Sequence, residues 1–278
     1  MRLGGPIFEE FTNAAGWIAA LKRLGYSAAH CPVKADANEE AIASYVEAAR
    51  SAGIVIAEVG AWSNPLSDDD KTRSEALEGC KRQLALADKV GALCCVNIAG
   101  SRGEQWDGPY RENFSDETFE SIVATVREIV DEVAPTRTFY TLEPMPWVPP
   151  DSPDSYLELI KAIDRKQFAV HLDPANMINS PRLYYGNADF LRECFAKLGP
   201  YIKSVHAKDV SMSNQFNVNV SQVAPGQGSL DYRVFLEEMD KLGPDVPLLT
   251  EHLDTAEEYR RAADFIRAAA GEAGVRIK

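Results

Sequence analysis

The sequence predicts a single (β/α)₈ (TIM) barrel of the α/β class, and three observations support this prediction. Short apolar runs alternate eight times with amphipathic stretches of helical period. Most of these runs are continuously apolar, which is typical of parallel strands that are covered on both faces. The chain has 278 residues, which suits the ~250 residues of such a barrel. An open doubly wound sheet is the alternative, but its GxGxxG fingerprint is absent.

The first half of the chain supplies four strand–helix pairs. The expected strands are the apolar runs at 6–11, 26–33, 54–62 and 92–100. The amphipathic stretches that follow them are 13–25, 39–53, 69–91 and 115–134. Gly53 stands where a helix would stop, and Ser115 stands where the fourth helix would be capped.

The second half repeats this order without a break. Its expected strands are 137–144, 168–174, 201–209 and 246–253. Its expected helices are 152–165, 187–199, 229–243 and 256–274. The longest expected loops, at 101–114, 176–186 and 210–228, all follow strands. Because no Pro/Gly/Ser-rich linker divides the chain, we expect residues 1–278 to form one domain.

Composition and charge exclude several classes of function. The formal net charge is −13 and the basic residues are scattered, so nucleic acid is not an expected partner. No run approaches the ~18 apolar residues of a membrane span, and no signal-peptide region is evident, so we expect no membrane partner and a cytoplasmic location. The five cysteines include no CxxC pair and are expected to be reduced core residues.

Polar residues follow the last four expected strands. In a barrel of this kind the active site lies at the carboxyl ends of the strands, so these side chains should converge. Three of them are carboxylates, and burying carboxylates together without a counter-charge is prohibitive. A divalent cation would resolve this repulsion. The residues are Glu143, Asp173, His206 and Glu251.

A ligand set of three oxygens and one nitrogen favours a hard or borderline ion. Mn²⁺ and Mg²⁺ fit it best, with Co²⁺ and Zn²⁺ as alternatives, and the absence of cysteine ligands argues against a structural zinc site. We therefore expect one divalent metal at this end of the barrel.

Other residues near the expected site each have two interpretations. His171 is a candidate substrate-binding residue, and because it shares a strand face with Asp173 it either supports that carboxylate or is a core histidine. Lys208 either serves the site, by holding a substrate hydroxyl or by neutralising the acidic groups, or forms an ordinary salt bridge. Glu58 either touches substrate or forms a loop ion pair. Trp147 follows a strand, where its ring could stack on a sugar or pack beneath a loop.

Two features of the last two units also carry expectations. His252 follows Glu251 directly, so on a strand it should point away from it, into the layer between barrel and helices. The segment PGQG at 225–228 either holds phosphate at a helix entrance or forms a tight turn. No basic residue accompanies it, which favours the turn and a substrate without phosphate.

The motifs TLEP, HLDPAN, VHAKD with the later PGQGSLDY, and LLTEH resemble those of the xylose-isomerase-like barrels of the sugar phosphate isomerase/epimerase family. The resemblance extends over essentially the whole chain. Its specific part is the ordered set of Glu, Asp, His and Glu on the last four strands, and each family ligand has a matching residue. The family includes ketose 3-epimerases, hydroxypyruvate isomerase and inosose dehydratase.

The resemblance implies a metal-dependent isomerase or epimerase that acts on a keto-sugar or sugar derivative. One divalent metal, often Mn²⁺, would be held by the four matching residues. Of these, Glu143 and Glu251 would be catalytic, one removing the proton α to the carbonyl and the other returning it, with an enediolate between the two steps. The family further suggests a homo-oligomer.

The sequence also departs from the ketose epimerases. Asn176 stands where they have a histidine that helps to bind substrate, and Met212 stands where they have an arginine. The order His206-x-Lys208-Asp209 is closer to the dehydratase branch. A lyase or dehydratase on a keto-inositol or 3-keto-glycoside is therefore the alternative activity, and a non-catalytic carbohydrate-binding barrel is a third interpretation.

Overall fold

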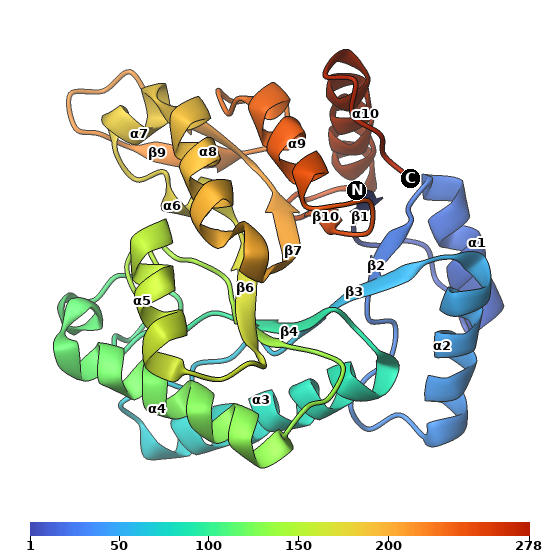
Figure 1. Ribbon diagram of the computed structural model, residues 1–278, viewed down its shortest axis with the longest axis horizontal. Coiled ribbons are helices and arrows are strands. Elements are labelled where there is room, and N and C mark those ends of the chain that lie inside the picture. Colours follow the sequence, from blue (N-terminus) through green and yellow to red (C-terminus); the bar gives the residue numbers. More distant parts are fainter.

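Eight parallel strands form the barrel in a computed structural model that describes residues 1–278. Neighbours in the sheet follow the order β1-β10-β7-β6-β5-β4-β3-β2. The gap between the first and last of these is bridged by Ser27, whose N–H donates to Leu3 O at 3.0 Å. The predicted fold class is thus confirmed (Figure 1). The strands are β1 Arg2–Gly4, β2 Ala28–His30, β3 Val55–Gly60, β4 Cys94–Asn97, β5 Tyr140–Leu142, β6 Phe168–Leu172, β7 Ile202–Ala207 and β10 Pro247–Thr250.

Eight long helices surround the strands, and local caps explain where several of them begin and end. Ser115 accepts a hydrogen bond from Thr118 N–H at the start of α4, and Gly53 ends α2 in the left-handed conformation, as the sequence predicted. The long helices are α1 Ala14–Leu24, α2 Glu39–Ala52, α3 Asp70–Val90, α4 Asp116–Val133, α5 Pro153–Ile163, α8 Asn187–Leu198, α9 Tyr232–Lys241 and α10 Ala256–Glu272. The short ones are α6 Pro174–Met177, α7 Pro181–Tyr185, η1 Arg111–Phe114 and η2 Gly199–Tyr201.

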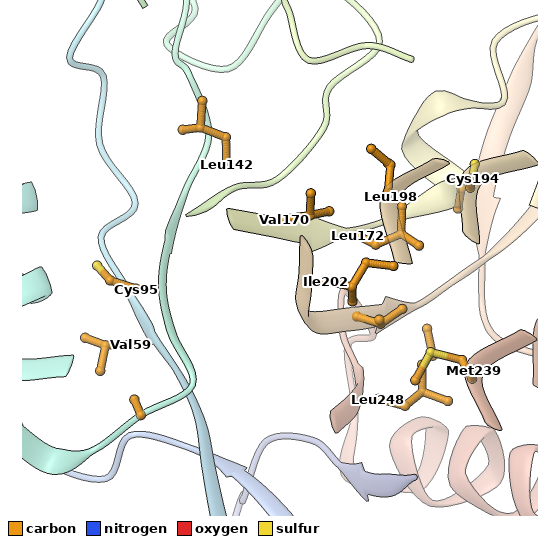
Figure 2. Close-up of a cluster of buried hydrophobic side chains, with 14 of the residues drawn as sticks. Val59, Cys95, Leu142, Val170, Leu172, Cys194, Leu198, Ile202, Met239 and Leu248 are labelled. Atoms are coloured by element: carbon orange, nitrogen blue, oxygen red, sulfur yellow. The ribbon is translucent and has the colours of Figure 1, made fainter. Parts of the chain in front are cut away.

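The hydrophobic core lies between the strands and the helices. Val170 and Leu172 of β6 pack beside Leu198 of α8, as Figure 2 shows. Because side chains alternate along a strand, His171 between them points to the opposite face, into the barrel. The same alternation therefore builds the core on one face and delivers polar groups to the other.

The first strand differs from the prediction. Residues 6–11 form no strand, and β1 instead spans Arg2–Gly4. Pro6 has no N–H to donate to a ladder, which disfavours the predicted segment. Gly4 permits the close packing of β1, because a Cβ at this position would lie 2.4 Å from Ala28 O.

The expected loop at 210–228 contains a hairpin. Strands β8 (Asp209–Met212) and β9 (Val220–Val223) pair antiparallel and lie outside the barrel sheet. The predicted cysteine state is consistent with the structure, where all five cysteines are free. None of the helices is both long enough and apolar enough to cross a membrane.

Candidate metal centre

The backbone at the end of β6 fixes the position of the Asp173 carboxylate. Asp173 is the N-cap of α6, and its Oδ1 accepts hydrogen bonds from Ala175 N–H at 3.1 Å and Asn176 N–H at 3.3 Å. Pro174 occupies the first helical position, where its missing N–H costs nothing. The second oxygen, Oδ2, is left to face the barrel interior.

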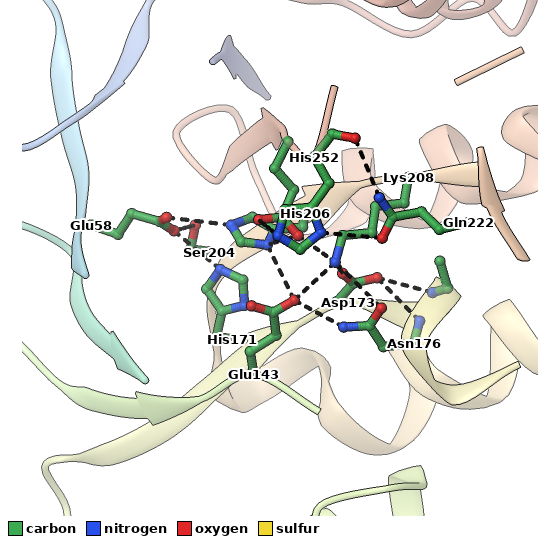
Figure 3. A network of polar contacts seen from close by, with 12 residues as sticks. Glu58, Glu143, His171, Asp173, Asn176, Ser204, His206, Lys208, Gln222 and His252 are labelled. Carbon is green, nitrogen blue, oxygen red and sulfur yellow. Dashed lines mark hydrogen bonds and ion pairs between the residues drawn. The ribbon is translucent and has the colours of Figure 1, made fainter. Parts of the chain in front are cut away.

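The four polar strand ends converge. One ligand atom from each residue lies within 4.8 Å of the others, and the set consists of Glu143, Asp173, His206 and Glu251. His206 Nδ1 lies 2.8 Å from Glu251 Oε1. It lies 3.5 Å from Glu143 Oε1 (Figure 3). The structure therefore brings together all four residues of the predicted metal site.

The donor atoms of this cluster are suited to a cation. Asp173 Oδ2, His206 Nδ1 and Glu251 Oε1 are buried and have no hydrogen bond of acceptable geometry. Lys208 Nζ faces both carboxylate oxygens and His206 Nδ1 faces Glu251 Oε1, so the three atoms converge on cationic partners as they would on a metal ion. Three carboxylates and one imidazole suit Mn²⁺ or Mg²⁺, and also admit Co²⁺ and Zn²⁺.

Lys208 is the counter-charge that the protein itself supplies. Its ammonium lies 2.6 Å from Asp173 Oδ2 and 3.1 Å from Glu143 Oε1, and it also contacts Glu251. Burial alone would lower the pKa of Lys208, but the three carboxylates outweigh it and raise that pKa well above its ordinary value. Lys208 thus neutralises the acidic site, as one of its two predicted interpretations held.

The carboxylates respond differently to this environment. Burial raises the pKa of Asp173 to about 7, although Lys208 opposes the shift. Burial would also raise the pKa of Glu143, but Lys208 and His206 outweigh it and hold that pKa well below its usual range. Glu143 is therefore ionised at neutral pH, as a general base must be.

Asn176 orients Glu143. Its amide nitrogen donates to Glu143 Oε1 at 2.9 Å and to Pro144 O at 3.1 Å, while its carbonyl oxygen accepts from Lys208 Nζ at 3.3 Å. Asn176 also lines the cavity, so a substrate contact remains open to it.

Glu58 takes a different place from the one expected. Its carboxylate is buried and faces three histidines rather than a loop cation: His171 Nε2 at 3.1 Å, His206 Nε2 at 3.3 Å and His30 Nδ1 at 3.4 Å. Ser204 donates to it at 3.0 Å. These contacts occupy both carboxylate oxygens, so Glu58 supports His206. Glu58 also contributes to the cavity lining, so the predicted substrate contact stays a prediction.

His171 likewise lies behind the site. It is fully buried, does not line the cavity, and contacts Glu58 instead of the Asp173 carboxylate that the sequence suggested. Its Nδ1 has no partner. The interpretation of His171 as a substrate contact is therefore not supported by its position.

A cavity of about 840 Å³ opens above the cluster. Glu143, Glu251, Lys208 and Trp147 contribute to its lining. The prediction for His252 was wrong: it lines the cavity with its side chain 60% exposed, because a left-handed backbone (φ 55°) turns it out of the strand direction. Sequence alternation alone could not reveal this turn, since β10 ends at Thr250.

The PGQG segment is a turn held by Asp209. The carboxylate of Asp209 accepts hydrogen bonds from Gly226 N–H and Gly228 N–H, both at 3.0 Å. A Cβ at Gly228 would lie 2.3 Å from Asp209 Oδ1, so only glycine fits. The chain's own carboxylate already occupies the place that a phosphate would take.

Comparisons with known proteins agree with this architecture. The sequence matches the family model described as "xylose isomerase-like TIM barrel" over residues 18–269. No curated protein sequence matches the chain.

Several solved structures share the fold. D-psicose 3-epimerase from Clostridium cellulolyticum, solved with D-tagatose, superposes with a TM-score of 0.69 at 16% sequence identity. The alignment covers 97% of this chain and 99% of the epimerase chain. A probable 3-DHS dehydratase from Bacillus anthracis gives 0.71 at 16% identity, with coverage of 96% and 97%. Endonuclease IV from Thermus thermophilus gives 0.74 at 15% identity, with coverage of 98% and 100%. At such identities these similarities show the fold alone.

Proposed function

This chain belongs to the xylose isomerase-like TIM barrel family, and on that premise we propose that it is a divalent-metal-dependent isomerase or epimerase of a keto-sugar or sugar derivative. The observation that carries the proposal is the convergence of Glu143, Asp173, His206 and Glu251 at the floor of one large cavity. A sugar epimerase and a probable dehydratase share its fold.

The proposed cofactor is one divalent cation, Mn²⁺ first among Mg²⁺, Co²⁺ and Zn²⁺, held by these four residues. When bound, it would supply Lewis-acid polarisation of neighbouring oxygens of the substrate. Asp173 and His206 would serve as ligands only, because neither has a second free atom with which to reach a substrate: the other oxygen of Asp173 caps α6, and the other nitrogen of His206 contacts Glu58.

Glu143 and Glu251 are the proposed catalytic pair. One carboxylate removes the proton α to the substrate carbonyl, giving an enediolate, and later releases that proton to water. The other carboxylate first takes a proton from water and then delivers it to the opposite face of the enediolate. Both carboxylates are ionised at neutral pH, since burial would raise the pKa of Glu251 but His206 and Lys208 outweigh it, as they do for Glu143. The Lys208 ammonium and the Asn176 amide, both lining the cavity, are the proposed contacts to substrate hydroxyls.

A lyase or dehydratase acting on a keto-inositol or 3-keto-glycoside is the second candidate, and the placement of Lys208 favours it. After the same α-proton is removed, elimination needs an acid to protonate the departing oxygen. The buried Lys208 ammonium lines the cavity 3.1 Å from Glu143 Oε1 and would donate a hydrogen bond to the departing oxygen. Water would supply the proton, because the raised pKa of Lys208 makes it a weak acid.

Solvent isotope exchange separates these activities. Mn²⁺-loaded protein is incubated in D₂O with ketoses, keto-inositols and 3-keto-glucosides, and the products are analysed by mass spectrometry and NMR. Deuterium at an α-carbon without loss of mass supports the isomerase, whereas loss of water or of an aglycone supports the lyase. We expect Glu251→Gln to slow either reaction by at least ~100-fold, the usual contribution of a general base.

The matched control is Glu272→Gln, which changes an exposed glutamate at the end of α10 and should leave the rate unchanged. If the protein retains no divalent ion and promotes no exchange with any compound, the enzyme proposal fails and the non-catalytic carbohydrate-binding barrel takes its place.

A further inference from the structure

We propose that the mouth of the cavity is an outer subsite for an uncharged second ring, so that the substrate is a glycoside rather than a free monosaccharide or a sugar phosphate. This inference rests on the proposed function, because it assumes that a sugar ring occupies the acidic floor.

The size of the cavity is the first argument. Its volume of about 840 Å³ lies in the upper part of the ~300–1,000 Å³ range of pockets that enclose drug-sized ligands. The candidate metal centre lies at its floor, where Glu143 and Glu251 are the two members of the centre that contribute to the lining. A single six-membered sugar ring there would leave the wide outer part of the cavity without a ligand.

Three tryptophans line this outer part. Trp62 follows β3, Trp106 follows β4 and Trp147 follows β5, so three successive loops each contribute an indole. Their exposed fractions are 47%, 40% and 36%. A single exposed aromatic ring needs no explanation, but several around one cavity mark a binding surface. Flat apolar rings with a polar edge suit the faces of sugar rings.

The indoles are held in place. Trp147 Nε1 donates to Asp107 O at 2.9 Å, which ties the loop after β5 to the loop after β4. A Cβ at Gly60 would lie 2.4 Å from Trp62 Nε1, so glycine at this position lets the indole rest against the backbone. A preorganised aromatic surface loses little freedom when a ligand binds.

Polar side chains line the cavity as well. Asn219, Ser221 and Gln222, at the start of β9 and along it, contribute to the lining. Gln222 Oε1 contacts His252 Nδ1 at 3.2 Å. Amides and hydroxyls of this kind can exchange hydrogen bonds with the hydroxyl groups of a sugar.

The charge of the lining indicates an uncharged ligand. The cavity lining contains no arginine and a single lysine, Lys208, which is already surrounded by carboxylates. The N–H groups of Gly226 and Gly228 are taken by Asp209. A phosphate would find no free cation here.

Calorimetric titration of the Mn²⁺-loaded protein with inert sugars tests the proposal. The probes are methyl β-D-glucopyranoside with one ring, cellobiose with two rings, and glucose 6-phosphate against glucose. We expect cellobiose to bind about tenfold more tightly than the one-ring glycoside, as one or two stacking contacts allow. Glucose 6-phosphate should bind no more tightly than glucose.

Variants locate the effect. Trp62→Ala and Trp147→Ala should each remove most of the advantage of cellobiose and leave binding of the one-ring glycoside unchanged, while the corresponding Phe variants should keep it. Trp147→Ala also removes the hydrogen bond from Trp147 Nε1 to Asp107 O, which joins two loops. Trp62→Ala breaks no hydrogen bond of the indole, so it separates the loss of stacking from the loss of that hydrogen bond. Ligand quenching of indole fluorescence provides an independent readout, since the remaining tryptophan, Trp17, is buried.

Equal affinity for one and two rings, equal weakening of both by the Ala variants, or tighter binding of the phosphorylated sugar would overturn the proposal. Because these sugars do not react, the result is independent of catalysis. Selective binding of two rings without isotope exchange would support the outer subsite and reject the proposed reaction. Isotope exchange without selective binding of two rings would support the proposed reaction and reject the outer subsite.

Discussion

Three of the four histidines in the chain contact one buried carboxylate, that of Glu58. Burial would raise the pKa of Glu58, but the histidines outweigh it and hold that pKa well below its ordinary value. An ionised carboxylate can only accept, so Glu58 orients His206 with Nε2–H toward itself and Nδ1 toward Glu251 and Glu143. A carboxylate behind a ligating histidine commonly sets its orientation in this way.

At the residue scale we predict that Glu58→Gln weakens Mn²⁺ binding by roughly 10- to 100-fold, the usual effect of removing such a support. The amide offers a single acceptor oxygen and brings N–H groups against the histidine donors. The signal of free Mn²⁺ in electron paramagnetic resonance measures the affinity directly. Glu272→Gln, at the exposed end of α10, is the matched control. An unchanged affinity would reduce Glu58 to a packing role.

At the scale of elements, the β8–β9 hairpin and the turn beside it depend on Asp209. Its Oδ1 accepts from Val210 N–H and Leu230 N–H, both at 2.8 Å, and its Oδ2 accepts from Gly226 and Gly228. One side chain thereby joins β8 to the segment that leads into α9. Because β9 contributes to the cavity lining, this anchor also shapes the site.

We predict that Asp209→Asn lowers the free energy of unfolding by ~1–3 kcal/mol, because the amide nitrogen cannot accept and leaves buried N–H groups unpaired. Urea denaturation measures this loss. Amide exchange should quicken at residues 226–230 and stay unchanged in α4. Asp240→Asn, at an exposed position of α9, should alter neither quantity. Unchanged exchange at the turn would show that Asp209 does not hold it.

At the scale of the whole molecule, the barrel gathers carboxylates from strands that are distant in sequence, and Lys208 and His206 balance them. A bound cation should stabilise the folded chain, since the unfolded chain has no such cluster. We predict that Mn²⁺ at 100 times its Kd adds ~2.7 kcal/mol to the free energy of unfolding, and that a single domain unfolds in one transition.

Thermal unfolding with EDTA or with added Mn²⁺ measures this effect. Glu251→Gln should shrink the shift in Tm caused by Mn²⁺, whereas Glu272→Gln should preserve it. A shift of equal size in both variants would mean that the ion binds elsewhere.

Much of the fold could be predicted from local patterns. The helical period at 39–53 and the stop at Gly53 match α2 closely, because amphipathic spacing and capping are properties of a few consecutive residues. The first strand could not be placed in this way, since its position depends on close packing of Gly4 against β2. The sequence did not predict the hairpin within 210–228. Its two strands pair across a polar loop, and this pairing leaves no periodic pattern in consecutive residues.

The sequence by itself determined the eight strand–helix units and the identity of the four polar residues at the last strand ends. Both follow from periodicity and from the rule that strand ends in a barrel share one face. Only the tertiary structure decided that Glu58 supports His206, that Lys208 lies among the carboxylates, and that His252 faces the cavity. These contacts join residues from different strands or depend on a left-handed turn, so barrel closure and register set them, and no local pattern encodes either.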